Sequence, residues 1–159
     1  MKTLYWALPL ATLATYAVLL GYVTPQLVAD ASGGMPFDLR LTGYGLGEAR
    51  AYLSGLSPAG VALYLRPFRL IDTILPMLVT ATLCLPLWRR GQFWFLPALA
   101  YGLFDLAENI AVARLLHAGP EVGAEAVALA SGFTQAKFVA LAVAVLLAVL
   151  ALWQARRAR

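Results

Sequence analysis

Long runs of apolar residues, separated by short polar segments, dominate the chain. Four windows contain the about 20 apolar residues that a helix needs to cross a ~30 Å hydrocarbon core, at 4–24, 66–88, 93–116 and 124–153. None of them alternates apolar and polar residues with the period of a membrane β-strand. The pattern predicts an all-α polytopic membrane protein, with four transmembrane helices bundled into a single transmembrane domain over residues 1–159.

The longest polar segment, residues 25–57, joins the first two predicted spans. Its first half is rich in turn-forming residues, whereas its second half carries apolar residues at helical spacing. These residues are Leu46, Ala49, Leu53 and Leu56. We expect a short amphipathic helix there, lying on the outer surface or covering the mouth of the bundle. Ser57 followed by Pro58 is typical of a helix start, so the second helix is expected to begin outside the bilayer.

Composition supports the assignment to a membrane. Of the 159 residues, 62% are hydrophobic and 13% are charged, and the mean hydropathy is +0.77. These values exclude an ordinary soluble domain. The net charge of +4 is not gathered on a basic face with interleaved aromatic residues, so no nucleic-acid partner is expected.

The basic residues outside the spans predict the orientation of the chain. On one side, all the charged residues are basic: Lys2, Arg89, Arg90, Arg156, Arg157 and Arg159. The other side mixes Arg40, Arg50, Arg66, Arg69 and Arg114 with Asp30, Asp38, Glu48, Glu121 and Glu125. The purely basic side also holds Trp6, Trp88, Trp94 and Trp153, the residue type that prefers headgroup layers. We expect both termini to be cytoplasmic, in the plasma membrane or the inner membrane of a bacterium.

A secretory signal is the alternative interpretation of the N-terminus. Lys2 and the apolar run after it are followed by the small residues Ala29 to Ala31, which could form a cleavage site. The apolar run has about 20 residues, however, whereas signal cores have about 7–15. We therefore favour a permanent transmembrane helix.

Metal and cofactor chemistry has little support in the sequence. Cys84 is the single cysteine and His117 the single histidine, so neither a cysteine-ligated metal nor a pair of histidine ligands is available. The glycine-rich stretch at 43–49 lacks the spacing of a phosphate-binding loop. We expect no metal and no cofactor.

Four ionisable residues fall inside the predicted spans: Asp72, Asp105, Glu108 and Lys137. Each would cost about 2.5–3.5 kcal/mol near the centre of a helix that faces lipid, so each is expected to face inward. At ~1.5 Å of rise per residue, the depth from the outer helix ends increases from roughly 8 Å at Asp72 to about 20 Å at Lys137.

Polar neighbours extend this set along the same helix faces. Asn109 and Tyr101 share a face with the two acidic residues of the third span, and Thr134 shares one with Lys137. We expect Lys137 to lie between the two carboxyl groups, and one of Arg66 and Arg69 to turn inward above them. The predicted ligand-binding residues are Arg66, Arg69, Asp72, Tyr101, Asp105, Glu108, Asn109, Thr134 and Lys137.

These residues predict a charged cavity within the membrane that opens to the outer side. The favoured function is binding of a lipid-like or small polar ligand; service as an accessory subunit of a membrane complex is also consistent, with membrane lipids and other subunits as partners. The alternative is an intramembrane enzyme, an isomerase or transferase with acid-base chemistry on a lipid or isoprenoid substrate. Its catalytic residues would be Asp105, Glu108 and Lys137. A purely structural role for the charges, as links between helices, remains open.

Overall fold

The computed structural model of the chain describes residues 2–91 and 93–157. Arg159 and the side chains of Lys2 and Arg89, which contribute to the predicted orientation, lie outside the described residues. The helical elements are α1 (Lys2–Val18), η1 (Leu19–Val23), α2 (Thr24–Asp30), η2 (Phe37–Leu39), α3 (Leu46–Gly55), α4 (Pro58–Leu63), η3 (Tyr64–Phe68), α5 (Arg69–Leu87), η4 (Trp88–Arg90), α6 (Leu96–Ala118), η5 (Gly119–Glu121) and α7 (Ala124–Arg157). The described residues contain no β-strand.

Four helices are long and apolar enough to cross a membrane, as predicted: Trp6–Asp30, Pro58–Leu87, Leu96–Glu121 and Ala124–Arg157. Large apolar side chains cover their outward faces, which suits a lipid environment. The all-α four-helix bundle is therefore confirmed. The first two helices are longer than the predicted spans, because single π-helical turns at η1 and η3 carry the helical path onward.

The junction between the first two long helices is closed by one carboxylate. Ser57 caps α4 by accepting a hydrogen bond from Gly60 N at 3.1 Å, as its position before Pro58 predicts. The Asp30 carboxylate, at the end of α2, accepts from Ser57 N at 2.9 Å and from Ser57 Oγ at 2.6 Å. The end of one helix is thus tied to the start of the next.

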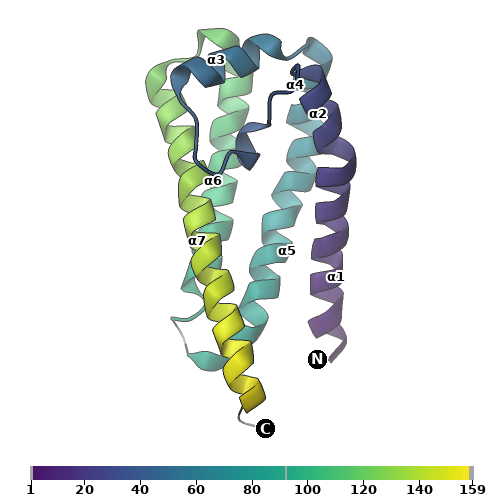
Figure 1. Cartoon of the computed structure of the whole chain (residues 1–159), viewed down its shortest axis with the longest axis vertical. Helices are drawn as coiled ribbons and strands as arrows, with labels where there is room; N and C mark the ends of the chain where they lie inside the picture. The colour runs from purple at the N-terminus through teal and green to yellow at the C-terminus, as the bar shows by residue number, and fades with distance from the viewer. Residues whose placement is uncertain (1, 92, 158–159) are drawn as a thin grey trace.

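The bundle has a simple order of neighbours. α1 packs mainly on α5, α5 on α6, and α6 on α7, while α7 also contacts α5. α1 begins and α7 ends at one end of the molecule, which we call the terminal end; α3 lies at the opposite end, which we call the plug end (Figure 1). Trp6, Trp88 and Trp153 lie in α1, η4 and α7, and Trp94 lies in the turn before α6, all towards the terminal end, as their expected role in a headgroup layer requires.

Two hydrophobic clusters fill the bundle. The larger one, at the plug end, includes Phe37, Tyr64 and Leu115. The smaller one, at the terminal end, contains Ala98, Ala144 and other small residues, which allow α6 and α7 to approach closely. The buried charged side chains of α6 and α7, which are Asp105, Glu108 and Lys137, lie between these two clusters in the sequence of each helix, so they form a polar layer across the bundle.

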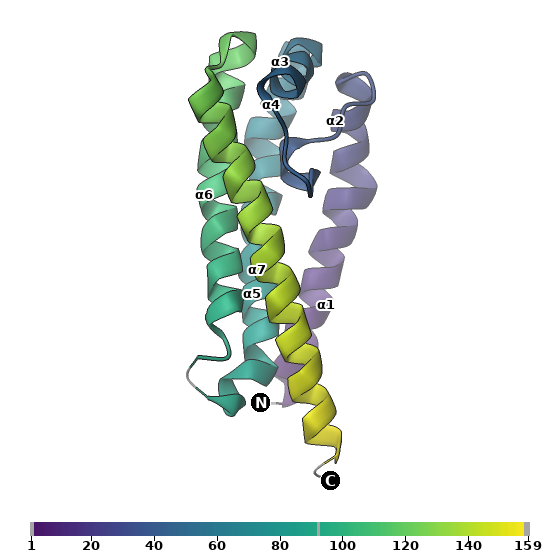
Figure 2. The same ribbon diagram turned by 60° about the vertical axis from the view of Figure 1, so that its left-hand side comes forward.

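Residues 31–45 do not form a simple surface loop. They descend from α2 into the space between the long helices and return to α3, as both ribbon views show (Figures 1 and 2). We call this segment the plug. Its element η2 contacts both α6 and α7. Irregular backbone at this depth is tolerated because protein, not lipid, surrounds it.

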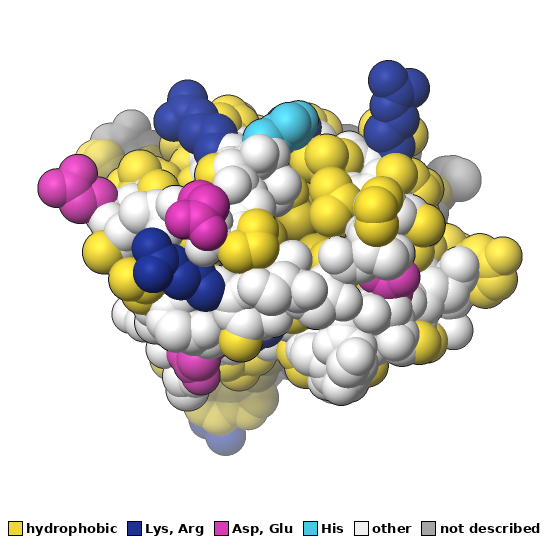
Figure 3. All heavy atoms as spheres, turned by 90° about the horizontal axis from the view of Figure 1, so that it is seen from above, with side chains coloured by type: hydrophobic (Ala, Val, Ile, Leu, Met, Phe, Trp, Pro, Cys, Tyr) yellow, Lys and Arg dark blue, Asp and Glu magenta, His cyan; other side chains and the backbone are white. Residues whose placement is uncertain are grey.

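The amphipathic helix expected in the outer segment is present as α3. Ala49, Tyr52 and Leu53 are buried against the bundle, while the opposite face is exposed. Arg50 fixes the helix over η5 by donating from Nε and Nη2 to Val122 O at 3.3 and 3.1 Å. Seen from the plug end, acidic and basic side chains are interspersed around the rim (Figure 3).

We expect Gly43→Ala to destabilise the plug. Gly43 has φ +77°, and a Cβ there would meet the side chains of Ser131 and Gln135 on α7. An L-residue in this conformation costs about 1–2 kcal/mol before any clash. The melting temperature in detergent should fall by several degrees. Gly132→Ala is the matched control, since a Cβ at Gly132 meets open space; equal melting temperatures for the two variants would contradict this role of Gly43.

Candidate functional site

The polar layer is organised around a lysine held by two carboxyl groups. Lys137 Nζ lies 3.0 Å from Asp105 Oδ1 and also forms an ion pair with Glu108 Oε2. The three residues are 4%, 3% and 0% exposed, respectively. The expected position of Lys137 between the carboxyl groups is therefore found.

Helical spacing brings these groups together. Asp105 and Glu108 are three residues apart on α6, and Thr134 and Lys137 are three apart on α7, so each pair shares a face. Thr134 Oγ1 donates to Glu108 Oε1, which adds a hydrogen bond to the ion pair. α6 and α7 are thus linked by charge and by a hydroxyl group inside the apolar bundle.

Asn109 extends the layer to α5. Its Nδ2 donates to Asp105 Oδ2 at 3.3 Å and approaches the backbone oxygen of Asp72 at 3.4 Å. Tyr101 lies one helical turn from Asp105 on α6 and is also buried. Seven of the nine predicted site residues therefore belong to one connected layer or border it directly.

Asp72 is the least satisfied member of the predicted set. It is buried, and its Oδ2 has no hydrogen-bond partner within the described part of the chain. Asp38 of the plug has the largest electrostatic effect on it among the charged groups. Asp38 is itself buried and accepts from Tyr64 Oη at 2.5 Å through Oδ2, while its Oδ1 has no described partner.

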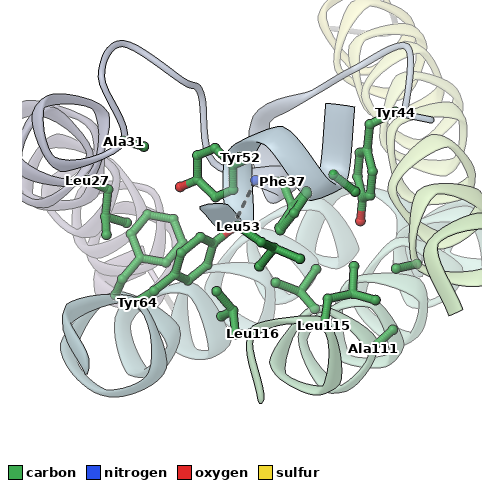
Figure 4. Packing of buried hydrophobic residues seen from close by; sticks show 14 of the residues in the cluster. Leu27, Ala31, Phe37, Tyr44, Tyr52, Leu53, Tyr64, Ala111, Leu115 and Leu116 are labelled. Carbon is green, nitrogen blue, oxygen red and sulfur yellow. Dashed lines mark hydrogen bonds between the residues drawn. The ribbon is translucent and has the colours of Figure 1, made fainter. Parts of the chain in front are cut away.

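Aromatic rings hold the plug over this layer. Phe37 packs against Tyr44 and Tyr52 with ring centroids 4.6 and 4.9 Å apart, and its backbone N–H donates to Tyr64 Oη at 2.9 Å (Figure 4). The Arg40 guanidinium covers the rings of Phe37, Tyr44 and Tyr52 at 5.0–5.7 Å. The plug is therefore a folded lid with an aromatic underside.

The tyrosines of this lid stay neutral. Burial raises the pKa of Tyr44 and Tyr52 above the ordinary value for a phenol, and the charge of Asp38 acts in the same direction on both. The Tyr52 hydroxyl has no described hydrogen-bond partner. It is thus a neutral donor that the protein itself does not use.

Two polar contacts connect the plug to α7. Tyr44 N donates to Ser131 Oγ and Gln135 Nε2 donates to Thr42 O, each at 2.9 Å. Ser131 and Gln135 are on the same helix as Thr134 and Lys137, so the lid and the ion pair share one support.

Arg66 and Arg69 do not join this layer, contrary to our expectation that one would turn inward. Arg66 is exposed and Arg69 half-buried, and both line a groove on the outer surface with Leu70 and Thr73. The reason is helical phase: Arg66, Arg69 and Thr73 lie along one outward face of the second long helix, while Asp72 faces the interior.

The expected opening next to Lys137 is not one of the two grooves that the structure describes. The described grooves, of about 590 Å³ beside Arg66 and about 550 Å³ beside Cys84, are not lined by Asp105, Glu108 or Lys137. Element η2 of the plug contacts α6 and α7, the two helices that carry these three residues. The side chains of Asp105, Glu108 and Lys137 are themselves buried.

Sequence reasoning missed Asp38 and Tyr64. Asp38 was counted among the acidic residues of the outer segment, and Tyr64 received no role. The residues next to Asp38 could have indicated that it is buried. It stands in the stretch 36–39, whose other residues, Pro36, Phe37 and Leu39, are apolar, and such a context is unusual for a solvated loop.

The described residues contain no group of three or more His, Cys, Asp or Glu side chains arranged to hold a metal ion. Comparisons of the chain with protein-family models, with curated proteins and with solved structures find no match. What the protein does must therefore be inferred from its own residues.

We expect Lys137→Ala to destabilise the detergent-extracted protein strongly, because it leaves two buried carboxyl groups without their cation. Removing one partner of a buried ion pair costs about 3–5 kcal/mol. Arg114→Ala is the control, since Arg114 is exposed at the plug end of α6. Thermal melts that show equal losses for the two variants would contradict the importance of the ion pair.

Proposed function

We propose that this protein is a membrane-embedded binding protein, with a site for a lipid-like or small polar ligand between the plug and the polar layer. The ligand would enter from the plug end when the plug withdraws. The proposal rests mainly on two buried carboxyl oxygens, Asp38 Oδ1 and Asp72 Oδ2, that lack a hydrogen-bond partner among the described residues.

These two atoms are hard to explain by a structural role alone. Polar contacts between membrane helices contribute about 0.6 kcal/mol on average, whereas an unsatisfied buried polar group costs about 1–3 kcal/mol. Lys137 forms its ion pairs with Asp105 and Glu108, and among the described residues neither Asp38 nor Asp72 forms an ion pair. A ligand that donates hydrogen bonds to these two oxygens would remove the cost of burying them unsatisfied, and the gain would contribute to its affinity.

The buried polar atoms that lack a hydrogen-bond partner define the class of ligand. Asp38 and Asp72 offer acceptors, and Tyr52 offers a hydroxyl group that can also accept or donate. Among the described residues, the interior holds four carboxyl groups, Asp38, Asp72, Asp105 and Glu108, and one buried lysine. A polar group that carries N–H donors and a positive charge, such as a primary ammonium, fits this surplus of acid best.

Access requires movement of the plug, and its attachment makes such movement feasible. The backbone of residues 31–45 is largely irregular, and its polar links to α7 are the contacts to Ser131 and Gln135. Segments with few regular hydrogen bonds are the ones that open most readily in a folded protein.

The other predicted functions stay predictions. An accessory role in a membrane complex has no specific contact in its favour. For an intramembrane enzyme, the two carboxyl groups of α6 would have to be free for acid-base chemistry, but Lys137, Thr134 and Asn109 already engage them. The binding function needs no such rearrangement of the ion pair.

We further infer that the protein lies in a plasma membrane, or the inner membrane of a bacterium, with both termini in the cytoplasm. The support is the excess of basic residues and the tryptophans at the terminal end. The plug and the binding site would then face away from the cytoplasm.

We expect Asp72→Asn to abolish binding of an ammonium probe without harming the fold. The variant replaces an incompletely paired buried carboxyl group by an amide of the same shape, which cannot become negatively charged beside an ammonium group. Ethanolamine should raise the melting temperature of the wild type in detergent, but not that of the variant, while ethylene glycol, which has a hydroxyl in place of the ammonium, should raise neither. Sodium chloride at equal concentration controls for ionic strength.

Glu125→Gln is the control for loss of an acidic group, because Glu125 is exposed. Native mass spectrometry of the wild type and of Asp72→Asn adds a readout for any ligand retained from the membrane. If Asp72→Asn lowers the melting temperature while the wild type neither responds to ethanolamine nor retains a ligand, Asp72 is a structural residue and the proposed binding function is wrong.

The inferred orientation predicts the behaviour of terminal fusions. Green fluorescent protein attached after Arg159 should fluoresce, and alkaline phosphatase attached there should be inactive, because the first folds in the cytoplasm and the second outside it. The reverse pattern would place the basic end outside the cytoplasm and would contradict the positive-inside interpretation.

A further inference from the structure

A groove on the outward face of the second long helix carries two arginines that the protein does not neutralise. Its volume is about 590 Å³, and it is lined by Leu65, Arg66, Pro67, Arg69, Leu70 and Thr73. Within the described part of the chain, neither Arg66 nor Arg69 forms an ion pair with an acidic residue. The nearest acidic residue in sequence, Asp72, is buried on the other side of the helix.

The position of the two arginines matches a lipid headgroup layer. The second long helix runs from Pro58 to Leu87, which is 30 residues. A ~30 Å hydrocarbon core takes about 20 of them at ~1.5 Å per residue. Counted from Leu87, next to the tryptophan and arginines of η4, the core ends close to Phe68. Arg66 and Arg69 therefore lie at the boundary between hydrocarbon and headgroups.

The other residues that line the groove also suit a lipid, which has an apolar part below its headgroup. Leu65, Pro67 and Leu70 are apolar and suit the glycerol and upper acyl region of a lipid. Thr73 Oγ1 donates to Arg69 O at 2.7 Å, so its hydroxyl hydrogen is already satisfied inside the helix. The unsatisfied donors of the groove are thus the two guanidinium groups, which match phosphate oxygens in geometry and charge.

We propose that this groove binds the phosphate group of an anionic phospholipid from the leaflet at the plug end, with Arg66 and Arg69 as its ligands. Two guanidinium groups at headgroup depth need counter-charges that the protein does not supply, and an anionic phospholipid provides one together with apolar chains for the adjacent side chains. This site lies outside the bundle and is independent of the proposed interior binding site.

The test is titration of detergent-solubilised protein with phosphatidylglycerol, followed by native mass spectrometry, with phosphatidylcholine as the zwitterionic comparison. Each arginine at a membrane surface contributes roughly a fivefold gain in affinity for anionic lipid. We expect Arg66→Ala and Arg69→Ala each to weaken binding of phosphatidylglycerol about fivefold, and the double variant about 25-fold. Binding of phosphatidylcholine should change little.

Arg114→Ala is the matched control, because Arg114 is an exposed arginine at the same end of the bundle but outside the groove. Arg66→Lys with Arg69→Lys keeps the charge and should recover part of the affinity. Melting temperatures close to that of the wild type show that the variants are folded. Equal effects of Arg114→Ala and the double variant, or full competition by inorganic phosphate at millimolar concentration, would overturn the assignment to a phospholipid.

Discussion

The ion pair of Lys137 with Asp105 and Glu108 is the interaction on which the rest of the bundle depends. Charges in a hydrocarbon environment must be paired within the protein, so α6 and α7 have to meet in the one register that brings these groups together. Apolar packing above and below this layer is less specific, since leucine and alanine side chains pack in many registers and lipid competes for them. The polar layer therefore defines how the apolar surfaces of the two helices align.

The plug is a second consequence of buried polarity. Its irregular backbone enters the bundle because Phe37 and neighbouring rings bury apolar surface there, and because protein groups satisfy many of its polar atoms. It also adds Asp38 to the buried carboxyl groups of the interior, and an oxygen of Asp38 lacks a hydrogen-bond partner among the described residues. The same segment thus closes the bundle and contributes part of its polar interior.

The charged residues of the second long helix divide into two classes by the side of the helix that they occupy. Asp72 faces the interior and adds to the acidic surplus beneath the plug, while Arg66 and Arg69 face outward at headgroup depth. Opposite charges are therefore separated across one helix instead of being paired. This separation leaves an acidic interior and a basic lipid-facing groove, two environments that suit ligands of opposite charge.

The sequence by itself determined the four membrane helices, the helix over 46–55 and the inward position of Lys137, because each depends on local spacing and on the cost of exposing charge to lipid. Only the tertiary structure decided that the outer segment folds back between the helices and that Asp38 belongs to the interior. It also decided the outward position of Arg66 and Arg69, because helical spacing groups residues on one face without saying whether that face meets the bundle. Contacts between distant segments, such as Phe37 with Tyr64, depend on packing that no local pattern encodes.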